Sequence, residues 1–342
     1  MVASLSPGSL STVAPFRWQD GERLIVFGRG ALAQAGDLLT EGYALLTTPR
    51  ALMHDPGTLR DRAAAVHDVQ PGRVDEIAAL LRGQVGAQLL VALGGGRVID
   101  VAKALAAADP PRRVAAIPTT LSGAQMTAIH RHAEGVDATT ARVRPALVID
   151  DPSLSTSQPL EELAASACNA LGHAVEGPLT PLSSPVPAMA AVEAARLLVA
   201  GFQGAPGAQP DHDALALGAL LAGYAIGSTG YGLHHVLSQT LVRFAGVSHG
   251  SSNAIMLPHS IPALARRVPE PIARLADALG EDPAAAAARL GALTGAARLR
   301  ELGVSEGELE RCAEEAAGRP ELHLTPTAAE LGELRELYAA AY

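Results

Sequence analysis

Continuous apolar runs and turn residues divide the first half of the chain into short segments of alternating type. Consecutive apolar residues predict buried strands at 23–27, 43–48, 89–93, 114–117 and 146–149. Helical spacing of apolar residues occurs from about residue 31, over 74–81 and over 99–107. Because the strands are apolar throughout and alternate with helices, the pattern predicts a mainly parallel sheet covered on both faces.

The pattern changes after Asp151-Pro152, where strand signals nearly stop and Ala/Leu-rich helical spacing takes over. Loops are predicted at Thr180–Pro187 and Gly204–Pro210. Residues 1–15 are rich in Ser and Pro, which predicts a flexible arm. We therefore predict a Rossmann-like α/β domain over 16–155 and an all-α domain over 156–342.

The composition of this 342-residue chain is typical of two domains with a large buried core. Hydrophobic residues make up 48% and charged residues 18%, which excludes a disordered chain. Aromatic residues are only 3%, so the core is expected to consist of Ala, Leu, Val and Ile. The net charge of −9, without a run of Lys or Arg, excludes a nucleic-acid partner.

The two cysteines and the first residues predict a cytoplasmic location. Cys168 and Cys312 form neither a disulfide framework nor a zinc-ribbon spacing, which fits a reducing compartment. No basic region followed by an apolar run opens the chain, so no signal peptide is expected. No apolar stretch reaches the roughly 18 residues that cross a bilayer, so no membrane partner is expected.

A glycine-rich turn, Gly94-Gly95-Gly96, lies between a buried strand and a helix. Such a turn lets phosphates approach the backbone, and the following helix N-terminus offers free N–H groups. A tight turn without any ligand is the alternative. Thr119 and Thr120 follow another strand, where they could add hydroxyl donors to the same crevice or only cap a helix.

Histidines recur in the weakly charged second half. Asn169 and His173 are four residues apart on one helical segment, so they share a face of it, and His235 and Gln239 do the same on a later segment. His249 follows at a turn. Three histidines and an oxygen ligand could bind Zn²⁺ or Fe²⁺. Ordinary histidines satisfied by their surroundings are the alternative. His234 would point about 100° away from His235, so it could serve the substrate instead of a metal.

Together, these segments resemble the group III (iron-containing) alcohol dehydrogenase superfamily, over roughly residues 20–265. The matching motifs are Gly94–Lys103, Ile117–Thr127, Asn169–Glu176, Gly232–Leu237 and Pro258-His259. The double histidine His234-His235, Asn169 and the strand end Thr47-Thr48-Pro49 are most similar to the maleylacetate reductase branch.

The resemblance implies a dehydroquinate synthase-like fold, a cleft between two domains and a homodimer. It implies NAD(P)H-dependent reduction of maleylacetate to 3-oxoadipate, a step of aromatic catabolism. The substrate, maleylacetate, is then an anionic small molecule. The cofactor residues that it implies are Gly94, Gly95, Gly96, Arg97, Asp100, Thr119, Thr120 and Thr127. Its metal ligands for Fe²⁺ or Zn²⁺ are Asn169, His173, His235 and His249. The catalytic residues are then His173, His235 and His234, the last as proton donor because histidine titrates near neutral pH.

The chain departs from the superfamily pattern at several of these positions. Asn169 replaces the usual Asp and removes a negative charge from the ligand set. Gln239 replaces a histidine and cannot relay a proton at neutral pH. Arg97 replaces a small residue beside the expected pyrophosphate, and Gln125 replaces a carboxylate. Ala146 stands where a basic residue near the cofactor is common.

Four hypotheses therefore stand. The first is a maleylacetate reductase-type enzyme, and the second is a metal-dependent alcohol dehydrogenase. The third is a repurposed lyase or cyclase without redox chemistry, and the fourth is a binding scaffold. The choice between NADH and NADPH stays open, because Thr47-Thr48 lacks the acidic residue that favours a free 2′-hydroxyl.

Overall fold

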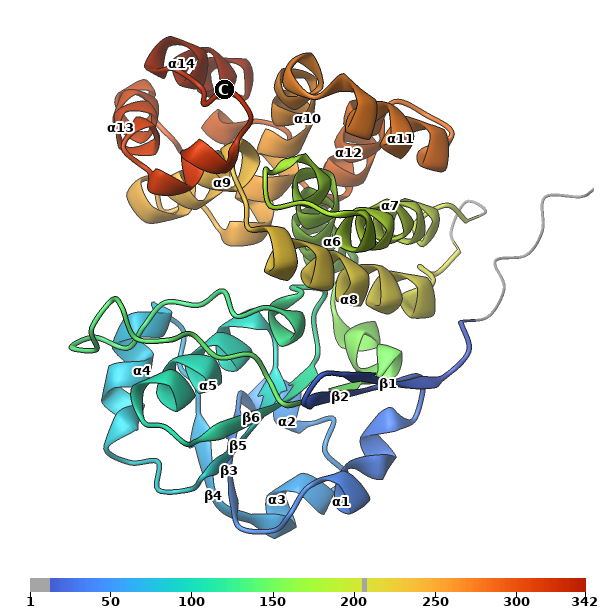
Figure 1. The fold of residues 1–342 in the computed structure, drawn as a ribbon, viewed down its shortest axis with the longest axis vertical. Coiled ribbons are helices and arrows are strands. Elements are labelled where there is room, and N and C mark those ends of the chain that lie inside the picture. Colours follow the sequence, from blue (N-terminus) through green and yellow to red (C-terminus); the bar gives the residue numbers. More distant parts are fainter. Residues whose placement is uncertain (1–12, 205–207) are drawn as a thin grey trace, which may run out of the picture.

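The computed structural model describes residues 13–204 and 208–342, which form a sheet layer and a bundle of helices (Figure 1). Within these ranges a seven-stranded sheet has the order β1-β2-β7-β6-β5-β3-β4. Its strands are β1 Phe16–Asp20, β2 Arg23–Phe27, β3 Tyr43–Thr47, β4 Ala63–Asp68, β5 Leu89–Gly94, β6 Arg113–Pro118 and β7 Leu147–Asp150. Only the β1–β2 pair is antiparallel among these strands, which confirms the predicted α/β fold class. Residues 1–12 of the predicted arm lie outside the described residues.

Alternate side chains of the central strands enter two separate cores on opposite faces of the sheet. Leu46 and Ala92 face the helices α4 (Val74–Arg82) and α5 (Gly96–Ala108). Leu45 and Val91 face the other core, with residues of three short helices: α1 Ala35–Leu38, α2 Pro49–Leu52 and α3 Thr58–Arg62. Both faces are covered, which explains why the strand sequences are apolar without alternation.

Two strands were not predicted from the sequence, and both lie at the edges of the sheet. β1 alternates between half-buried and exposed residues, and most residues of β4 are exposed. Neither strand therefore carries the continuous apolar run that marks a buried strand. The prediction for α5 was also three residues late, because the helix begins at Gly96 and not near Ile99.

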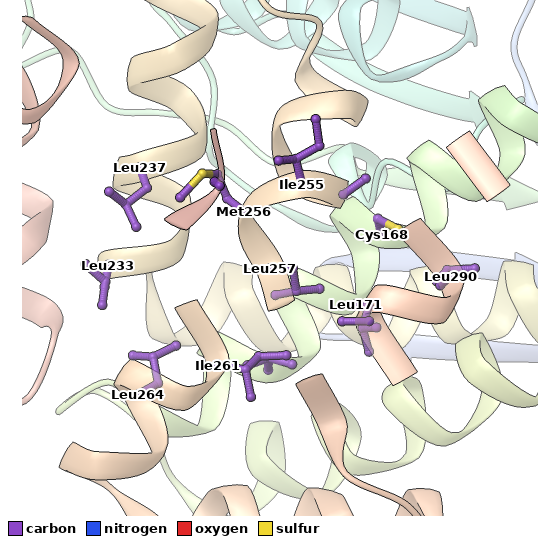
Figure 2. Packing of buried hydrophobic residues seen from close by; sticks show 14 of the residues in the cluster. Cys168, Leu171, Leu233, Leu237, Ile255, Met256, Leu257, Ile261, Leu264 and Leu290 are labelled. Atoms are coloured by element: carbon purple, nitrogen blue, oxygen red, sulfur yellow. The ribbon is translucent and has the colours of Figure 1, made fainter. Parts of the chain in front are cut away.

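The helices after residue 159 pack around one large core. They are α6 Leu160–Glu176, α7 Pro185–Ala200, α8 His212–Thr229, α9 Leu233–Phe244, α10 His249–Arg267, α11 Pro269–Leu279, α12 Pro283–Gly291, α13 Glu306–Ala317 and α14 Leu331–Ala340. Figure 2 shows Leu257 of α10 between Leu171 of α6 on one side and Leu233 of α9 on the other. The core consists mostly of Ala, Leu, Val and Ile, as the low aromatic content predicts.

In the described ranges, no single helix is both long and apolar enough to cross a membrane. The pair α8 and α9 passes that test only when joined, and it is bent by 100° at the break between the two helices. The last strand ends at Asp150 and α6 begins at Leu160. The division into domains at 155/156, the homodimer and the cytoplasmic location stay predictions.

Candidate active site

A cavity of about 300 Å³ lies at the carboxyl end of the sheet, beside the glycine-rich turn. Its lining includes residues that follow β5 and β6, residues that follow β3, and residues of α6 and the segment before it: Gly95, Gly96, Arg97, Val98, Thr119, Thr120, Thr48, Arg50, Ala51, His54, Ser157, Gln158 and Glu162. β5 and β6 are parallel neighbours, so the turn after β5 and the threonines after β6 meet at one edge. The structure thus brings together five of the residues predicted to bind a cofactor: Gly95, Gly96, Arg97, Thr119 and Thr120.

The turn has no room for side chains and leaves backbone donors free. A Cβ at Gly95 would lie 3.0 Å from Thr120 Cγ2, and one at Gly96 would lie 2.9 Å from Ser122 Cβ. Gly95 is the N-cap of α5 and provides no side-chain cap, so the first N–H groups of this 13-residue helix remain without a partner within the helix. This combination is the one that binds phosphate groups.

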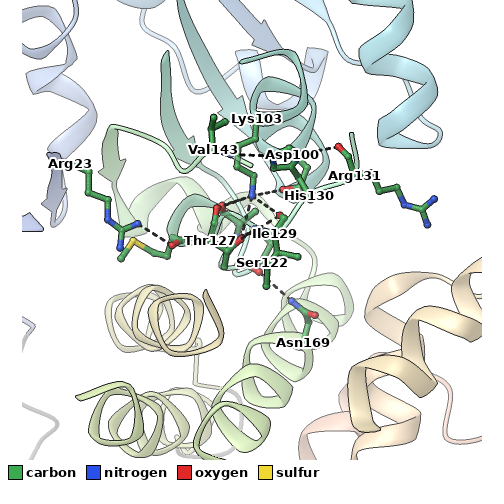
Figure 3. A network of polar contacts seen from close by, with 12 residues as sticks. Arg23, Asp100, Lys103, Ser122, Thr127, Ile129, His130, Arg131, Val143 and Asn169 are labelled. Atoms are coloured by element: carbon green, nitrogen blue, oxygen red, sulfur yellow. Dashed lines mark hydrogen bonds and ion pairs between the residues drawn. The ribbon is translucent and has the colours of Figure 1, made fainter. Parts of the chain in front are cut away.

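Asp100 and Thr127, also predicted to bind the cofactor, belong to a different contact (Figure 3). Lys103 on α5 is fully buried and lies 2.8 Å from Asp100 Oδ1. Its Nζ donates to the carbonyl oxygens of Ala124 and Ile129, at 3.0 and 2.9 Å, and to Thr127 Oγ1 at 3.3 Å. These bonds fix the loop after β6 on α5. The geometry gives Asp100 and Thr127 a structural role in holding that loop.

The same loop connects the sheet to α6. Leu121 N donates to Ser166 Oγ at 2.9 Å. Asn169 Nδ2 donates to the Ser122 carbonyl at 3.3 Å, as Figure 3 shows. Asn169 Oδ1 is buried and has no partner among the described residues. The amide at 169 therefore joins the two layers through its nitrogen and keeps its oxygen free. A carboxylate at this position has no N–H to donate to Ser122.

Beyond this loop, His173 of α6 and His234 and His235 of α9 lie in one group. The rings of His173 and His235 are stacked with centroids 4.9 Å apart, and those of His234 and His235 meet edge to face at 5.0 Å. The two helices approach closely at Gly172, where a Cβ would lie 2.7 Å from His234 Nε2. His249 begins α10, and solvent reaches its side chain.

A buried carboxylate, Glu176, orders this group from the end of α6. Its Oε1 accepts the backbone N–H of His234 at 2.7 Å, and its Oε2 accepts that of His235 at 3.3 Å. These N–H groups belong to the first turn of α9, whose N-cap Gly232 has no side chain to satisfy them. Glu176 Oε2 also lies 2.7 Å from His235 Nδ1. One carboxylate therefore caps α9 and orients the His235 ring.

Burial makes these imidazoles neutral at physiological pH. It lowers the pKa of both His234 and His235 to about 3, and it lowers the pKa of His173 well below its ordinary value. After burial, the neighbouring His235 and His249 contribute most to lowering the pKa of His173. Neutral rings offer lone pairs to a metal ion or to hydrogen-bond donors.

Two of the ring nitrogens are buried without a partner in the described parts of the chain: His173 Nδ1 and His235 Nε2. With the His235 Nδ1–H directed at Glu176, Nε2 carries the lone pair. Buried polar atoms are rarely left unpaired, so these atoms mark a place for a ligand. No three His, Cys, Asp or Glu side chains in residues 13–204 and 208–342 converge closely enough to hold a metal. The metal-ligand set with His249 thus stays a prediction.

The proton-donor role predicted for His234 does not fit its surroundings. Its side chain is fully buried, with Nδ1 2.9 Å from Ser260 Oγ and Nε2 3.0 Å from Asn253 Oδ1. Both ring nitrogens are therefore engaged by the protein. Asn253 Nδ2 in turn donates to the His249 carbonyl at 2.7 Å. His234 connects α9 to the start of α10, which is a positioning role.

Gln125 and Gln239 both serve as hydrogen-bond partners. Gln125 donates to Asp150 Oδ2 at 3.1 Å, and burial raises the pKa of Asp150 to about 7. A glutamate at 125 would bring a second carboxylate to this buried position. Gln239 Oε1 accepts a hydrogen bond from Arg319 at 3.0 Å. The amide at 239 thus anchors an arginine one turn along α9 from His235.

Glu176 and Arg319 contact His235 and Gln239 but were not predicted as site residues, and neither was Arg243, whose pKa the charge of Arg319 lowers. Glu176 is the last residue of the Asn169–Glu176 motif, which was recognised in the sequence. Its hydrogen-bond partners, His234 and His235, are 58 and 59 residues away along the chain. Arg243 is eight residues after His235 and four after Gln239 on α9, so that spacing could have pointed to it. Arg319 carried no signal, because it lies in a different segment of the chain.

Family models match both halves of the chain. The iron-containing alcohol dehydrogenase model matches residues 23–152, and the model of the C-terminal part of that family matches residues 163–342. Maleylacetate reductase of Sphingobium indicum is 33% identical over 86% of this chain and 89% of its own length. Maleylacetate reductase of Rhizobium sp. is 30% identical over 96% of this chain and 98% of its own.

Solved structures agree with these relatives. The crystal structure of maleylacetate reductase from Agrobacterium tumefaciens is similar, with a TM-score of 0.83 and 28% identity, and covers 96% of this chain and 99% of that one. An iron-containing alcohol dehydrogenase from Corynebacterium glutamicum has a TM-score of 0.78 at 26% identity, over 93% and 94% of the two chains. The chain therefore belongs to the iron-containing alcohol dehydrogenase family, is an oxidoreductase, and resembles its maleylacetate reductases.

Proposed function

We propose that the chain is an NAD(P)H-dependent reductase of a small carboxylate substrate, of the maleylacetate type. The observation that supports it is the position of two free ring nitrogens, on His173 and His235, beside the loop that borders the glycine-turn cavity. Gly95, Gly96 and the first turn of α5 would hold the pyrophosphate, and Thr119 and Thr120 would add hydroxyl donors. The nicotinamide supplies the hydride when it is bound.

Three arginines whose charges act on one another support an acidic substrate: Arg131, Arg243 and Arg319. Arg243 lies on the His235–Gln239 face of α9, is exposed, and forms no ion pair with any described residue. The Arg319 side chain is 11% exposed and lies 2.9 Å from Glu321. Partial burial, followed by the nearby charges of Arg131 and Arg319, lowers the pKa of Arg243. Positive charges that crowd one another in this way are relieved by a bound carboxylate.

Arg243→Gln is expected to raise the KM for maleylacetate about 10- to 100-fold, the value of a charge-assisted hydrogen bond, with little change in kcat. The charge acts on the substrate carboxylate, which is the same in the ground state and the transition state. Steady-state kinetics measure both constants. Arg274→Gln, at a position 61% exposed on α11, is the matched control and leaves both unchanged. An unchanged KM in Arg243→Gln contradicts this assignment.

Gly95→Val is expected to raise the Kd for NADH by about 100-fold or more, because the added side chain meets Thr120 and displaces the turn whose N–H groups would bind the phosphate. A fluorescence titration with NADH measures this Kd. Gly307→Val on α13 is the control, since a Cβ there meets nothing within 4 Å. Unaltered NADH affinity in Gly95→Val would place the nucleotide elsewhere.

Oxidation of NADH or NADPH by the purified chain in the presence of maleylacetate tests the function as a whole. Turnover with formation of 3-oxoadipate supports the proposal. Nucleotide binding without turnover of maleylacetate or simple carbonyl compounds contradicts it and favours a non-redox member or a binding scaffold.

A metal-dependent alcohol dehydrogenase is the second candidate, favoured by the unpartnered His173 Nδ1 and His235 Nε2. Fe²⁺ or Zn²⁺ would be held by these atoms, His249 and the Asn169 oxygen, and would polarise the substrate oxygen. Neutral imidazoles fit such an ion chemically, but His249 would have to move closer to complete the set. Stoichiometric metal in the purified protein, with oxidation of alcohols that a chelator abolishes, would select this candidate.

A further inference from the structure

The end of β3 borders the proposed nucleotide cavity and lacks an acidic residue. β3 is the parallel neighbour of β5, so its carboxyl end lies next to the glycine turn. In parallel sheets of this kind, the adenosine ribose lies over such a neighbouring strand end. An Asp or Glu there accepts the ribose 2′-hydroxyl, whereas an Arg accommodates a 2′-phosphate. Here the strand ends in Thr47, followed by Thr48.

An arginine lies just beyond this strand end, on α2. Arg50, two residues after Thr48, lines the cavity together with His54. Arg50 NH2 donates to the Ser157 carbonyl at 3.0 Å and NH1 donates to Glu162 Oε2 at 2.7 Å. The guanidinium is therefore held at the cavity wall by Ser157, just before α6, and by Glu162 in the first turn of α6.

The charge of the cavity favours a phosphate. Its described lining contains two arginines, Arg50 and Arg97, and one carboxylate, Glu162. The Arg50–Glu162 pair is half exposed on both sides, at 48% and 52%, and such pairs contribute little. A phosphate dianion is a stronger, bidentate partner for a guanidinium than an exposed carboxylate. Arg50 can therefore exchange Glu162 for a phosphate at small cost.

We propose that Arg50 binds the 2′-phosphate of the cofactor and that the chain selects NADPH over NADH. The inference rests on the proposed function, because it assumes that a nicotinamide dinucleotide occupies this cavity. Arg97 has a different role in this arrangement. It lies on the glycine turn itself, so it would contact the pyrophosphate that both cofactors share.

Calorimetric titrations of the full chain test the proposal without any need for turnover. The probes are NADPH and NADH, and the fragments 2′,5′-ADP and 5′-AMP, which differ only in the 2′-phosphate. The unaltered chain is expected to bind NADPH at least about tenfold more tightly than NADH. Arg50→Gln is expected to lower this ratio roughly 10- to 100-fold, as for a lost charge-assisted hydrogen bond, and to lower the fragment ratio in parallel.

Two further variants separate Arg50 from its neighbours. Arg97→Gln is expected to weaken NADH and NADPH together and keep their ratio, whereas Glu162→Gln is expected to raise the ratio by freeing Arg50. Arg274→Gln, remote on α11, is the control for a general change in charge.

The contradicting outcomes are distinct. Equal affinities, or tighter binding of NADH, overturn the selection of NADPH but leave the reductase proposal intact. A ratio that falls in Arg97→Gln and not in Arg50→Gln moves the 2′-phosphate away from β3 and overturns the assignment. If neither dinucleotide binds, this inference and the proposed function both fail.

Discussion

Replacing His235 by alanine is expected to lower kcat by about 10²- to 10⁴-fold, the range for removal of a catalytic side chain. His235 Nε2 is a buried acceptor without a protein partner, in a ring stacked on His173 and held by Glu176. Removing the ring eliminates the lone pair that would accept a hydrogen bond from a substrate hydroxyl or bind a metal. Steady-state kinetics with maleylacetate and the preferred dinucleotide measure the loss.

A matched histidine separates this effect from general damage. His323, in the 3₁₀ segment Pro320–Leu324, is exposed, and His323→Ala is expected to leave kcat within about threefold. Dinucleotide titration shows whether His235→Ala retains its cofactor affinity, as expected for a folded variant. A kcat near that of the unaltered chain would mean that the chemistry takes place away from the histidine group.

Replacing Glu176 by alanine is expected to lower the free energy of unfolding by about 3–5 kcal/mol, as for removal of one partner from a buried charged contact. The substitution orphans two backbone N–H groups at the start of α9 and the His235 Nδ1 atom. Because the side chain is only 2% exposed, water cannot replace these bonds. Chemical denaturation followed by circular dichroism measures the change.

Glu176→Gln distinguishes the capping of α9 by the side chain from the effect of its negative charge on His235. The glutamine oxygen still accepts a backbone N–H, so this variant should lose less stability than Glu176→Ala, while His235 loses the charged acceptor that orients it. Glu193→Ala, at a site 47% exposed on α7, is the control and is expected to change stability by less than about 0.5 kcal/mol. Equal stabilities of Glu176→Ala and the unaltered chain would show that the carboxylate does not cap α9.

The layers of the fold could be predicted because their signals are local. A strand buried on both faces is apolar throughout, as in Leu89–Gly94, and a helix repeats its apolar positions every three to four residues. The glycine turn could be recognised for the same reason, because the three glycines that let a ligand approach the backbone are consecutive in the sequence. β1 and β4 were missed because an edge strand is half exposed and carries no such run.

The residue pairs of the site, in contrast, were decided by the tertiary structure. The sequence identified His173, His234 and His235, but not that one carboxylate would cap α9 and hold His235. It gave His234 a titrating role, whereas packing against Ser260 and Asn253 occupies both of its nitrogens. The sequence predicted that Asp100 and Thr127 bind the cofactor, whereas in the structure the buried Lys103 contacts both of them.

The physical reason is the range of the interactions. Periodicity and turn chemistry depend on neighbours within a few residues, so the sequence by itself determined the parallel sheet, the helical second half and the phosphate-type turn. The choice of hydrogen-bond partner and the burial that lowers a histidine pKa depend on side chains that meet only after the helices pack, as Glu176 meets His235 across 59 residues. Only the tertiary structure could therefore decide which nitrogens remain free for a ligand.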